Sequence, residues 1–378
     1  MKKLKMCWSV IAVMAILAFT FTSAIAVSPS STLNEVDDED AAILGELAPA
    51  PPGNGWLLRP HEVPLPAGAA LTATLEPTDP LPVSPANAEI LTTSLPVFQF
   101  TAAEGATKYK MEVFNLLTGV PVYTFKGTAQ CADSLCSLKP VTALNYYTIK
   151  EKSGLYAWRV MAKVNGAWQS SYSDYAQFTL LKPVGFYSTF STDDHKWFNV
   201  SGVWSLTTSG TLKTSGETGF YSSVVSKHAV QDGFVYEVKM KRKLSADAAN
   251  RIYFMGYPYD SGSLLPDKQW VDGYYFEYTN ASAWTFGKTY DGSSEVIKTA
   301  DSIAIAPYDW NTLTVMIEGN TVDLWINGQS VAVLSVDAAF EAGFVGIAMN
   351  KVVAEKSPLS VDYAKLEYTT TAPYPIPD

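Results

Sequence analysis

The chain has 378 residues, of which 13% are aromatic and 17% are charged, and it contains ten tryptophans. This composition excludes a disordered protein, favours β structure and suits about two domains. The formal charge of −10 argues against nucleic acid and anionic membrane surfaces as partners.

The N-terminus has the pattern of an export signal. Lys2, Lys3 and Lys5 precede an apolar run at positions 8–21, and small residues follow up to Ala26. The run is shorter than a membrane-spanning helix needs, so we expect residues 1–26 to be a signal peptide. Its removal leaves 24 basic and 37 acidic residues. We therefore expect a secreted or cell-surface, extracellular protein without membrane insertion after signal cleavage.

Residues 27–81 lack a periodic apolar pattern. They contain an acidic run at 35–40 and then many prolines and alanines. Such a composition predicts an extended, disordered linker.

Residues 82–181 have the alternation of short strands. The clearest are at 97–100, 109–114, 120–125, 154–164 and 175–181, and the turn Asn165-Gly166 follows the strongest of them. About seven strands in this length predict a β-sandwich. The runs PVFQFTAAEGATKYKMEVFN and GLYAWRVMAKVNGAWQSSYSDYAQFTL resemble a fibronectin type III domain. The resemblance implies a spacer module, with Trp158 in its core.

Two cysteines remain after signal cleavage, Cys131 and Cys136. A pair of cysteines in an exported protein predicts a disulfide, and two free thiols are the alternative. Because the closed loop is short, we expect a stabilisation of about 2 kcal/mol.

Residues 183–369 contain about eleven predicted strands without helical periodicity, and they predict a two-sheet jelly roll. The stretch 310–328, WNTLTVMIEGNTVDLWING, reads as a β-hairpin: Leu313, Val315 and Ile317 alternate with polar residues, and the return strand repeats this pattern. A hairpin needs a partner sheet to bury its apolar face. The fold class is therefore all-β, with two β-sandwiches after the signal peptide and linker.

The segments GFVYEVKMKR, DGYYFEYT, YDWNTLTVMIEGNTVDLWINGQSVAVLSVDAAFEAGFVGIAMN and SVDYAKLEY resemble the concanavalin A-like lectin/glucanase superfamily. Its laminin-G-like domains and the sandwich domain of 3-keto-disaccharide hydrolases are the most similar members. The resemblance implies a jelly-roll fold. It leaves the function open among lectins, hydrolases and structural modules.

No catalytic residue is predicted. Laminarinase-type relatives carry a Glu-x-Asp-x-x-Glu strand, whose carboxylates serve as nucleophile and acid/base, and the sequence has no such triplet. Glu237 and Glu277 are isolated, as are His195 and His228. Carboxylates that meet across strands stay an alternative, in which a glycan hydrolase of the 3-keto-disaccharide hydrolase-like class would depend on Glu277 or Asp323.

Calcium is the one cofactor to consider. Relatives of the resembled superfamily bind it with loop carboxylates, since Ca²⁺ takes six to eight oxygen ligands. Asp193 and Asp194 would meet Asp362 where the first and last strands are neighbours. Plain surface charge is the alternative, with no cofactor at all.

Aromatic residues beside acids indicate a carbohydrate site, because sugars stack on aromatic rings and donate hydroxyl protons to carboxylates. We predict Trp325 and Trp284 as stacking platforms, with Tyr275 beside them and Glu277 and Asp323 as acceptors. The predicted function is a secreted, non-catalytic protein that binds a glycan or glycoconjugate, or an adhesive protein. A purely structural surface protein is the remaining alternative, favoured if these side chains are buried.

Overall fold

The computed structural model describes residues 43–48, 65, 79–148, 153–192, 197–216, 221–258, 270–290, 292–336, 342–350 and 357–369. These residues form strands and turns and contain no helix, so the all-β prediction is confirmed. The predicted signal peptide, Asp193 and Asp194 lie outside the described residues. No helix in the described ranges is long and apolar enough to span a membrane.

The first sandwich has two sheets. The six-stranded sheet has the order β3-β11-β9-β5-β6, with β10 beside β9. Its strands are β3 (Glu89–Leu91), β5 (Ala106–Asn115), β6 (Pro121–Gly127), β9 (Leu155–Val164), β10 (Ala167–Trp168) and β11 (Ala176–Leu180). The second sheet has the order β2-β4-β8-β7 and consists of β2 (Pro82–Ser84), β4 (Phe98–Thr101), β7 (Gln130–Ala132) and β8 (Leu135–Leu138).

Trp158 is at the centre of this sandwich. It is completely buried, its ring lies 5.0 Å from that of Phe98 on the opposite sheet, and its indole N–H donates to the carbonyl oxygen of Pro85 at 2.9 Å. The predicted core position of Trp158 is therefore confirmed. The fibronectin type III assignment stays a prediction.

The disulfide between Cys131 and Cys136 is confirmed. The two residues are directly paired across the β7–β8 hairpin. The disulfide thus fastens one hairpin and does not join the two sheets of the sandwich.

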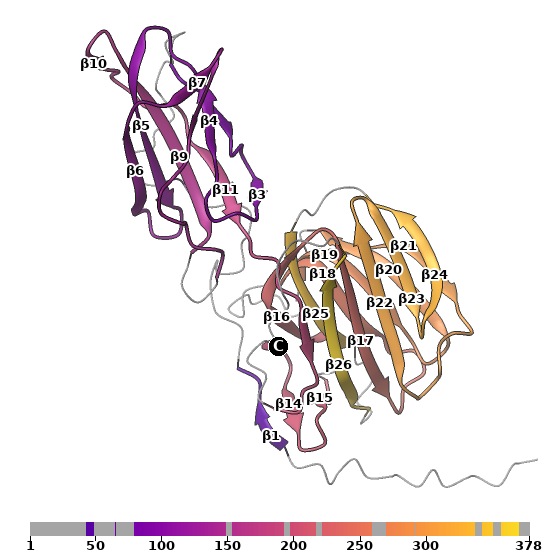
Figure 1. Cartoon of the computed structure of the whole chain (residues 1–378). Helices are drawn as coiled ribbons and strands as arrows, with labels where there is room; N and C mark the ends of the chain where they lie inside the picture. Colours follow the sequence, from indigo (N-terminus) through magenta and orange to yellow (C-terminus); the bar gives the residue numbers. More distant parts are fainter. Residues whose placement is uncertain are drawn as a thin grey trace, which may run out of the picture. The chain divides into compact units, whose positions relative to one another are not determined.

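The second sandwich is a jelly roll, whose strands lie in two layers (Figure 1). Sheet A has the order β1-β14-β15-β26-β17-β22-β23-β24, with β12 beside β26. Its strands are β1 (Ile43–Glu46), β12 (Phe186–Ser188), β14 (Trp204–Thr207), β15 (Leu212–Thr214), β17 (Phe234–Arg242), β22 (Asn311–Glu318), β23 (Thr321–Ile326), β24 (Gln329–Ser335) and β26 (Leu359–Tyr368).

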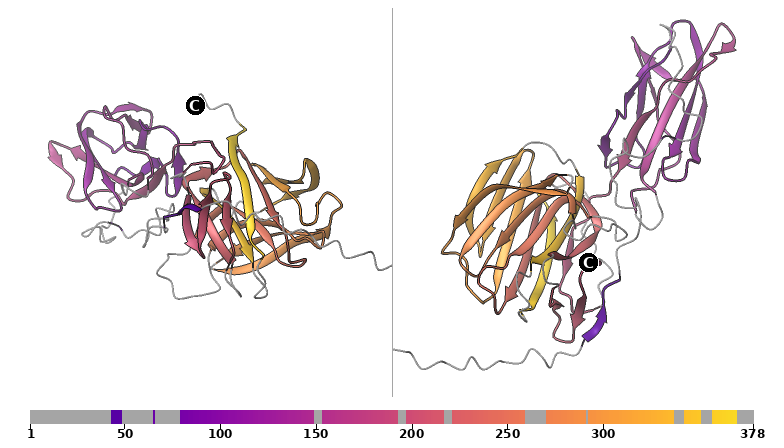
Figure 2. Two further views of the ribbon diagram at one scale, coloured as in Figure 1. Left: turned by 90° about the horizontal axis from the view of Figure 1, so that it is seen from below. Right: turned by 180° about the vertical axis from the view of Figure 1, so that it is seen from behind.

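Sheet B forms the other layer of the jelly roll. The right-hand view of Figure 2 shows the molecule from the side opposite to that of Figure 1. Its order is β13-β16-β25-β18-β19-β20-β21. Its strands are β13 (Trp197–Ser201), β16 (Tyr221–Gln231), β18 (Asn250–Pro258), β19 (Trp270–Tyr278), β20 (Ala283–Tyr290), β21 (Ser293–Asp301) and β25 (Ala342–Asn350).

The predicted hairpin is formed by β22 and β23, with Leu313 opposite Ile326 and Val315 opposite Leu324. All four side chains are buried in the core between sheets A and B. Asn327 occupies the turn after β23 with φ of 52°. Its side chain accepts from the backbone N–H of Thr312 and donates to the carbonyl oxygen of Ala304, so this asparagine fixes the loop and is not a free surface group.

The linker prediction is wrong for its first described residues. β1 pairs antiparallel with β14 at the edge of sheet A, and the N–H of Leu47 donates to the carbonyl oxygen of Trp204. Leu47 is buried in the jelly-roll core. A segment that precedes the first sandwich in the chain therefore belongs to the second.

Candidate functional site

The outer face of sheet A is set by the alternation of β17. Phe234, Tyr236, Val238 and Met240 are buried in the core, whereas the residues between them point away from it and are partly exposed. The outward residues include Glu237, Lys239 and Lys241. Strand periodicity thus places an acid and two amines in one line on the outer face.

A β-bulge in β26 places two successive side chains, Asp362 and Tyr363, on this face. Lys239 is opposite Tyr363 and Met240 is opposite Val361, so Asp362 is the extra residue in the register. Bulges of this kind redirect side chains. Here the carboxylate of Asp362 accepts from the amine of Lys239 at 2.7 Å.

Glu237 has two hydrogen-bond donors on neighbouring strands. The hydroxyl of Tyr363 donates to Oε1 at 2.7 Å, and that of Thr314 donates to Oε2 at 3.1 Å. Partial burial is the main cause that raises the pKa of Tyr363 to about 12, and the hydrogen bond to Glu237 is the second. Tyr363 therefore stays protonated and holds the carboxylate in place.

Trp310 lies beside the two lysines. Its ring centre is 5.3 Å from Nζ of Lys239 and 4.6 Å from Nζ of Lys241, distances at which a cation and an aromatic ring attract each other. The amine of Lys239 is also 6.0 Å from the ring of Tyr363. We call Glu237, Lys239, Lys241, Trp310, Asp362 and Tyr363 the lysine–aromatic surface.

Asp323 and Trp325 extend this surface across β23. Both are partly exposed, and Trp325 is opposite Thr314, which is itself opposite Glu237. The hydroxyl of Ser330 donates to Asp323 at 3.0 Å. These two predicted residues are therefore neighbours on an exposed face.

Tyr275 and Glu277 lie on the opposite side of the jelly roll, on the outer face of sheet B. Tyr274 and Phe276 alternate with them and fill the core. Because one predicted pair is on each outer face, the structure does not bring Trp325 and Asp323 together with Tyr275 and Glu277. The prediction of a single site made from all of these residues is wrong.

The residues around Arg251 form a closed cluster, which we call the arginine cluster: Tyr221, Arg251, Tyr253, Tyr275 and Glu277. The guanidinium donates to Glu277 at 2.7 Å, to the hydroxyl of Tyr253 at 2.8 Å and to that of Tyr221 at 2.7 Å. It also lies 3.9 Å from the ring centre of Tyr221 and 3.8 Å from that of Tyr275.

Electrostatics inside the arginine cluster favour a fixed ion pair. Burial opposes the charge of Arg251, but its tyrosine and glutamate neighbours outweigh this and raise its pKa. Burial also raises the pKa of Tyr221. Tyr275 is 2% exposed, with a ring face against the guanidinium, so it offers little surface for a sugar.

Trp284 is wrong as a stacking platform. It is 2% exposed and packs edge-to-face against Phe276 in the core, with ring centres 6.0 Å apart. The period-two pattern of β20 indicates two faces but does not say which one is buried. This residue therefore belongs to the core.

The calcium prediction receives no support from the side chains that are described. Asp362 forms an ion pair with Lys239. In the described part of the chain, no group of three or more His, Cys, Asp or Glu side chains is arranged to hold a metal ion. The chemistry of Asp362 here is that of an ion-pair partner.

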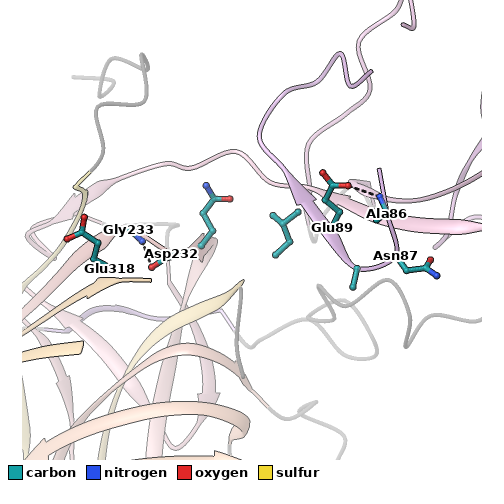
Figure 3. A pocket seen from close by; sticks show the side chains of 9 residues that line it. Ala86, Asn87, Glu89, Asp232, Gly233 and Glu318 are labelled. Carbon is teal, nitrogen blue, oxygen red and sulfur yellow. Dashed lines mark hydrogen bonds between the residues drawn. The ribbon is translucent and has the colours of Figure 1, made fainter. Parts of the chain in front are cut away.

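The pocket in Figure 3 is lined by residues 86–90 and by Gln231, Asp232, Gly233 and Glu318. Two of its three acids have local backbone partners. Glu89 accepts from the N–H of Ala86 at 2.6 Å, and Asp232 accepts from that of Gly233 at 2.8 Å. The lining has no aromatic side chain, and we assign it no ligand.

Sequence reasoning missed the centre of the lysine–aromatic surface. Glu237 was noted only as an isolated acid, and Lys239, Trp310 and Tyr363 were not selected. The alternation in FVYEVKMKR is the signal that would have put Glu237, Lys239 and Lys241 on one exposed face. No pattern in the sequence indicates the bulge at Asp362.

Comparison with known proteins agrees with the fold. The family model of the 3-keto-alpha-glucoside-1,2-lyase-like domain matches residues 185–355. No curated protein is similar to the chain.

The chain is similar to many solved structures at low identity, three of which follow. The carbohydrate-binding module CBM66 from Bacillus subtilis is 18% identical, with 44% of this chain and 92% of that chain covered and a TM-score of 0.35. A B. subtilis protein of unknown function with a galectin-like fold is 9% identical, with coverages of 49% and 96% and a TM-score of 0.40. The β-glucanase of Bacillus licheniformis is 14% identical, with coverages of 50% and 98% and a TM-score of 0.39.

Proposed function

We propose that the jelly roll binds carbohydrate without cleaving it, through the outer face of sheet A. One observation carries the proposal. Tyr187, Lys365, Glu237, Thr314 and Trp325 are opposite one another in a continuous row across β12, β26, β17, β22 and β23. Both ends of the row are aromatic and exposed to solvent, since Tyr187 is 57% exposed and Trp325 partly so.

The dimensions of this row suit an oligosaccharide. Four strand intervals of about 4.8 Å separate its ends by roughly 19 Å, which accommodates several sugar units. The aromatic ends provide stacking faces, and the acid, amine and hydroxyl between them provide polar partners for sugar hydroxyls. A flat, exposed row binds a chain along its length.

The bonding of the two glutamates favours binding over catalysis. Glu237 accepts from Tyr363 and Thr314, and Glu277 is paired with Arg251. Both carboxylates thus act as hydrogen-bond acceptors, which is the role that recognition of sugar hydroxyls requires. Cleavage of a glycoside needs a second carboxyl group beside the scissile bond, whereas Glu237 and Glu277 lie on different sheets of the jelly roll.

The test measures binding of the full chain to laminarin, mixed-linkage β-glucan, levan and xylan by affinity electrophoresis. Trp325→Ala removes one stacking platform and should weaken binding to the preferred glycan by about tenfold, equivalent to about 1.4 kcal/mol. Tyr290→Ala is the matched control, because Tyr290 is 66% exposed but lies on β20 of sheet B. Unchanged binding in Trp325→Ala, or equal losses in both variants, would contradict the proposal.

A lyase or hydrolase acting on 3-keto-α-glucosides is the second candidate. It is favoured by the family model over residues 185–355 and by the grouping of Glu277 and Tyr221 beside Arg251. A ketone at C3 acidifies the proton at C2, which a carboxylate base would remove as the C1 substituent leaves. Turnover of a 3-keto-α-glucoside, measured by release of its aglycone and abolished by Glu277→Gln, would establish this activity and displace the non-catalytic proposal.

A further inference from the structure

The lysine–aromatic surface has a cationic end. Lys239 and Lys241 are alternate residues of β17, so their side chains leave the same face about 7 Å apart along the strand. The amines lie 5.3 and 4.6 Å from the ring centre of Trp310, which keeps both near one position.

The two amines differ in their partners. Lys239 is paired with Asp362 at 2.7 Å. Lys241 has no carboxylate within ion-pair distance among the residues that the structure describes, and its recorded contact is the ring of Trp310. An aromatic ring attracts a cation but does not neutralise it. One positive charge is thus left over at this end, on a chain whose net charge is −10.

We propose that this end takes the carboxylate of a uronic-acid polysaccharide, bound between Lys241 and Lys239. The proposal rests on the proposed carbohydrate binding and specifies its ligand class. Asp362 already demonstrates that the amine of Lys239 is placed to pair with a carboxylate at this position of the sheet. A sugar carboxylate is the same chemical group, and it supplies the negative charge that Lys241 lacks.

The neighbouring rings of Tyr187 and Tyr363 provide a surface on which a sugar ring can stack. Tyr187 and Tyr363 are 5.8 Å apart and inclined at 49°, and Tyr187 is 57% exposed. The amine of Lys239 is 6.0 Å from the ring centre of Tyr363. A pyranose against these rings therefore brings a carboxylate on its C5 to the lysines, whereas a neutral sugar leaves Lys241 unpaired.

The other end of the surface has the opposite charge. Asp323 supplies a carboxylate on the same face of β23 as Trp325, and Glu237 supplies another on the far side of Thr314. A chain of sugars that crossed this face obliquely, from Trp325 to Trp310, would accordingly meet acceptors for neutral hydroxyls at the first ring and an anion site at the second. The surface thereby distinguishes a uronate-bearing polymer from a neutral one.

The experiment compares polygalacturonate, alginate and glucuronoxylan with the same polymers after reduction of their carboxyl groups to alcohols. Binding to the full chain is measured by affinity electrophoresis at low and at 0.5 M salt. We expect at least one uronate polymer to bind about tenfold or more tightly than its reduced form, with the difference shrinking at high salt because exposed charges are screened. Lys241→Met should reduce that difference about three- to tenfold.

Lys108→Met is the matched control, because Lys108 is an exposed lysine of β5 in the first sandwich. An equal loss in both variants would mean non-specific charge attraction and would overturn the proposal. Equal binding of native and reduced polymers would also overturn it, while leaving neutral glycan binding through Trp325 intact. Absence of binding to any glycan, charged or neutral, would instead show that the proposed function itself has failed.

Discussion

The two outer faces of the jelly roll use similar residues and differ in how those residues are paired. On sheet B, the guanidinium of Arg251 reaches Glu277, Tyr221 and Tyr253 at once and lies between two aromatic rings. On sheet A, the amine of Lys239 has one carboxylate and that of Lys241 has none among the described residues. A planar guanidinium binds several partners at once, whereas an amine acts as a point charge.

The comparison teaches that aromatic and acidic residues on a strand do not by themselves mark a ligand surface. Whether such residues can bind a ligand depends on the partners that they already have within the protein. Side chains whose hydrogen bonds are completed within the protein have little left for a ligand, as in the arginine cluster. Side chains that keep exposed faces and unpaired charge, as around Trp310, retain binding capacity.

The largest effect should come from breaking the closed cluster. Arg251→Met leaves the carboxylate of Glu277 without its cation in a mostly buried position, and we expect a loss of about 3–5 kcal/mol in the free energy of unfolding. Urea denaturation followed by tryptophan fluorescence measures it. Lys239→Met, the equivalent change on the exposed face, should cost less than about 1 kcal/mol. Similar losses in both variants would remove the distinction between the two faces.

A second effect tests how tightly sheet B is packed. The ring of Trp270 lies against Gly346, where a Cβ would overlap the ring and also approach the carbonyl oxygen of Val224 at 2.6 Å. Gly346→Ala should therefore destabilise the protein by about 1–3 kcal/mol. Gly45→Ala, on β1 of sheet A, has free space around the added methyl group. Its unfolding midpoint should stay unchanged, and a normal midpoint in Gly346→Ala would contradict the close packing of Trp270.

A smaller effect concerns the exposed face and its pH dependence. Tyr363→Phe removes the donor to Glu237 and should cost about 0.5–1.5 kcal/mol at neutral pH. The pKa of Tyr363 is about 12 in the folded chain against 10.0 for a free tyrosine. Because the pKa in the folded chain is the higher of the two, the contribution of protonated Tyr363 to the free energy of unfolding is complete below about pH 10. It is lost as the pH rises through about 12.

Ultraviolet titration of tyrosinate absorbance checks this last prediction. The wild-type chain should show one more group ionising near pH 12 than Tyr363→Phe, with the remainder of the curve superimposed. Loss of a group that ionises near pH 10 would instead mean that Glu237 and Tyr363 are not in contact.

Local patterns in the sequence predicted much of the fold. The alternation of Leu313, Val315 and Ile317 placed β22 and its buried face correctly, and the two cysteines indicated their disulfide. These features depend on residues within one strand or hairpin, which is the range over which side-chain periodicity carries information.

The site required information that local patterns lack. Trp325 and Tyr275 were both predicted to be exposed, yet they are on opposite sheets, and only Trp325 is partly exposed whereas Tyr275 is buried. Which sheet a strand joins depends on pairing between segments that are distant in the chain. For the same reason β1 was missed, because a four-residue strand in a proline-rich region takes its structure from its partner, β14.

The position of β1 also determines where the chain can be cut to separate the two sandwiches. The first sandwich is an insertion between two segments of the jelly roll, so a cut at the apparent domain boundary near Pro183 would not release a complete second domain. It would strip one strand from the edge of sheet A and leave β14 with unpaired backbone groups, which invite pairing with other chains. An isolated jelly roll that stays monomeric thus needs residues 43–48 joined to its N-terminus by a short artificial loop.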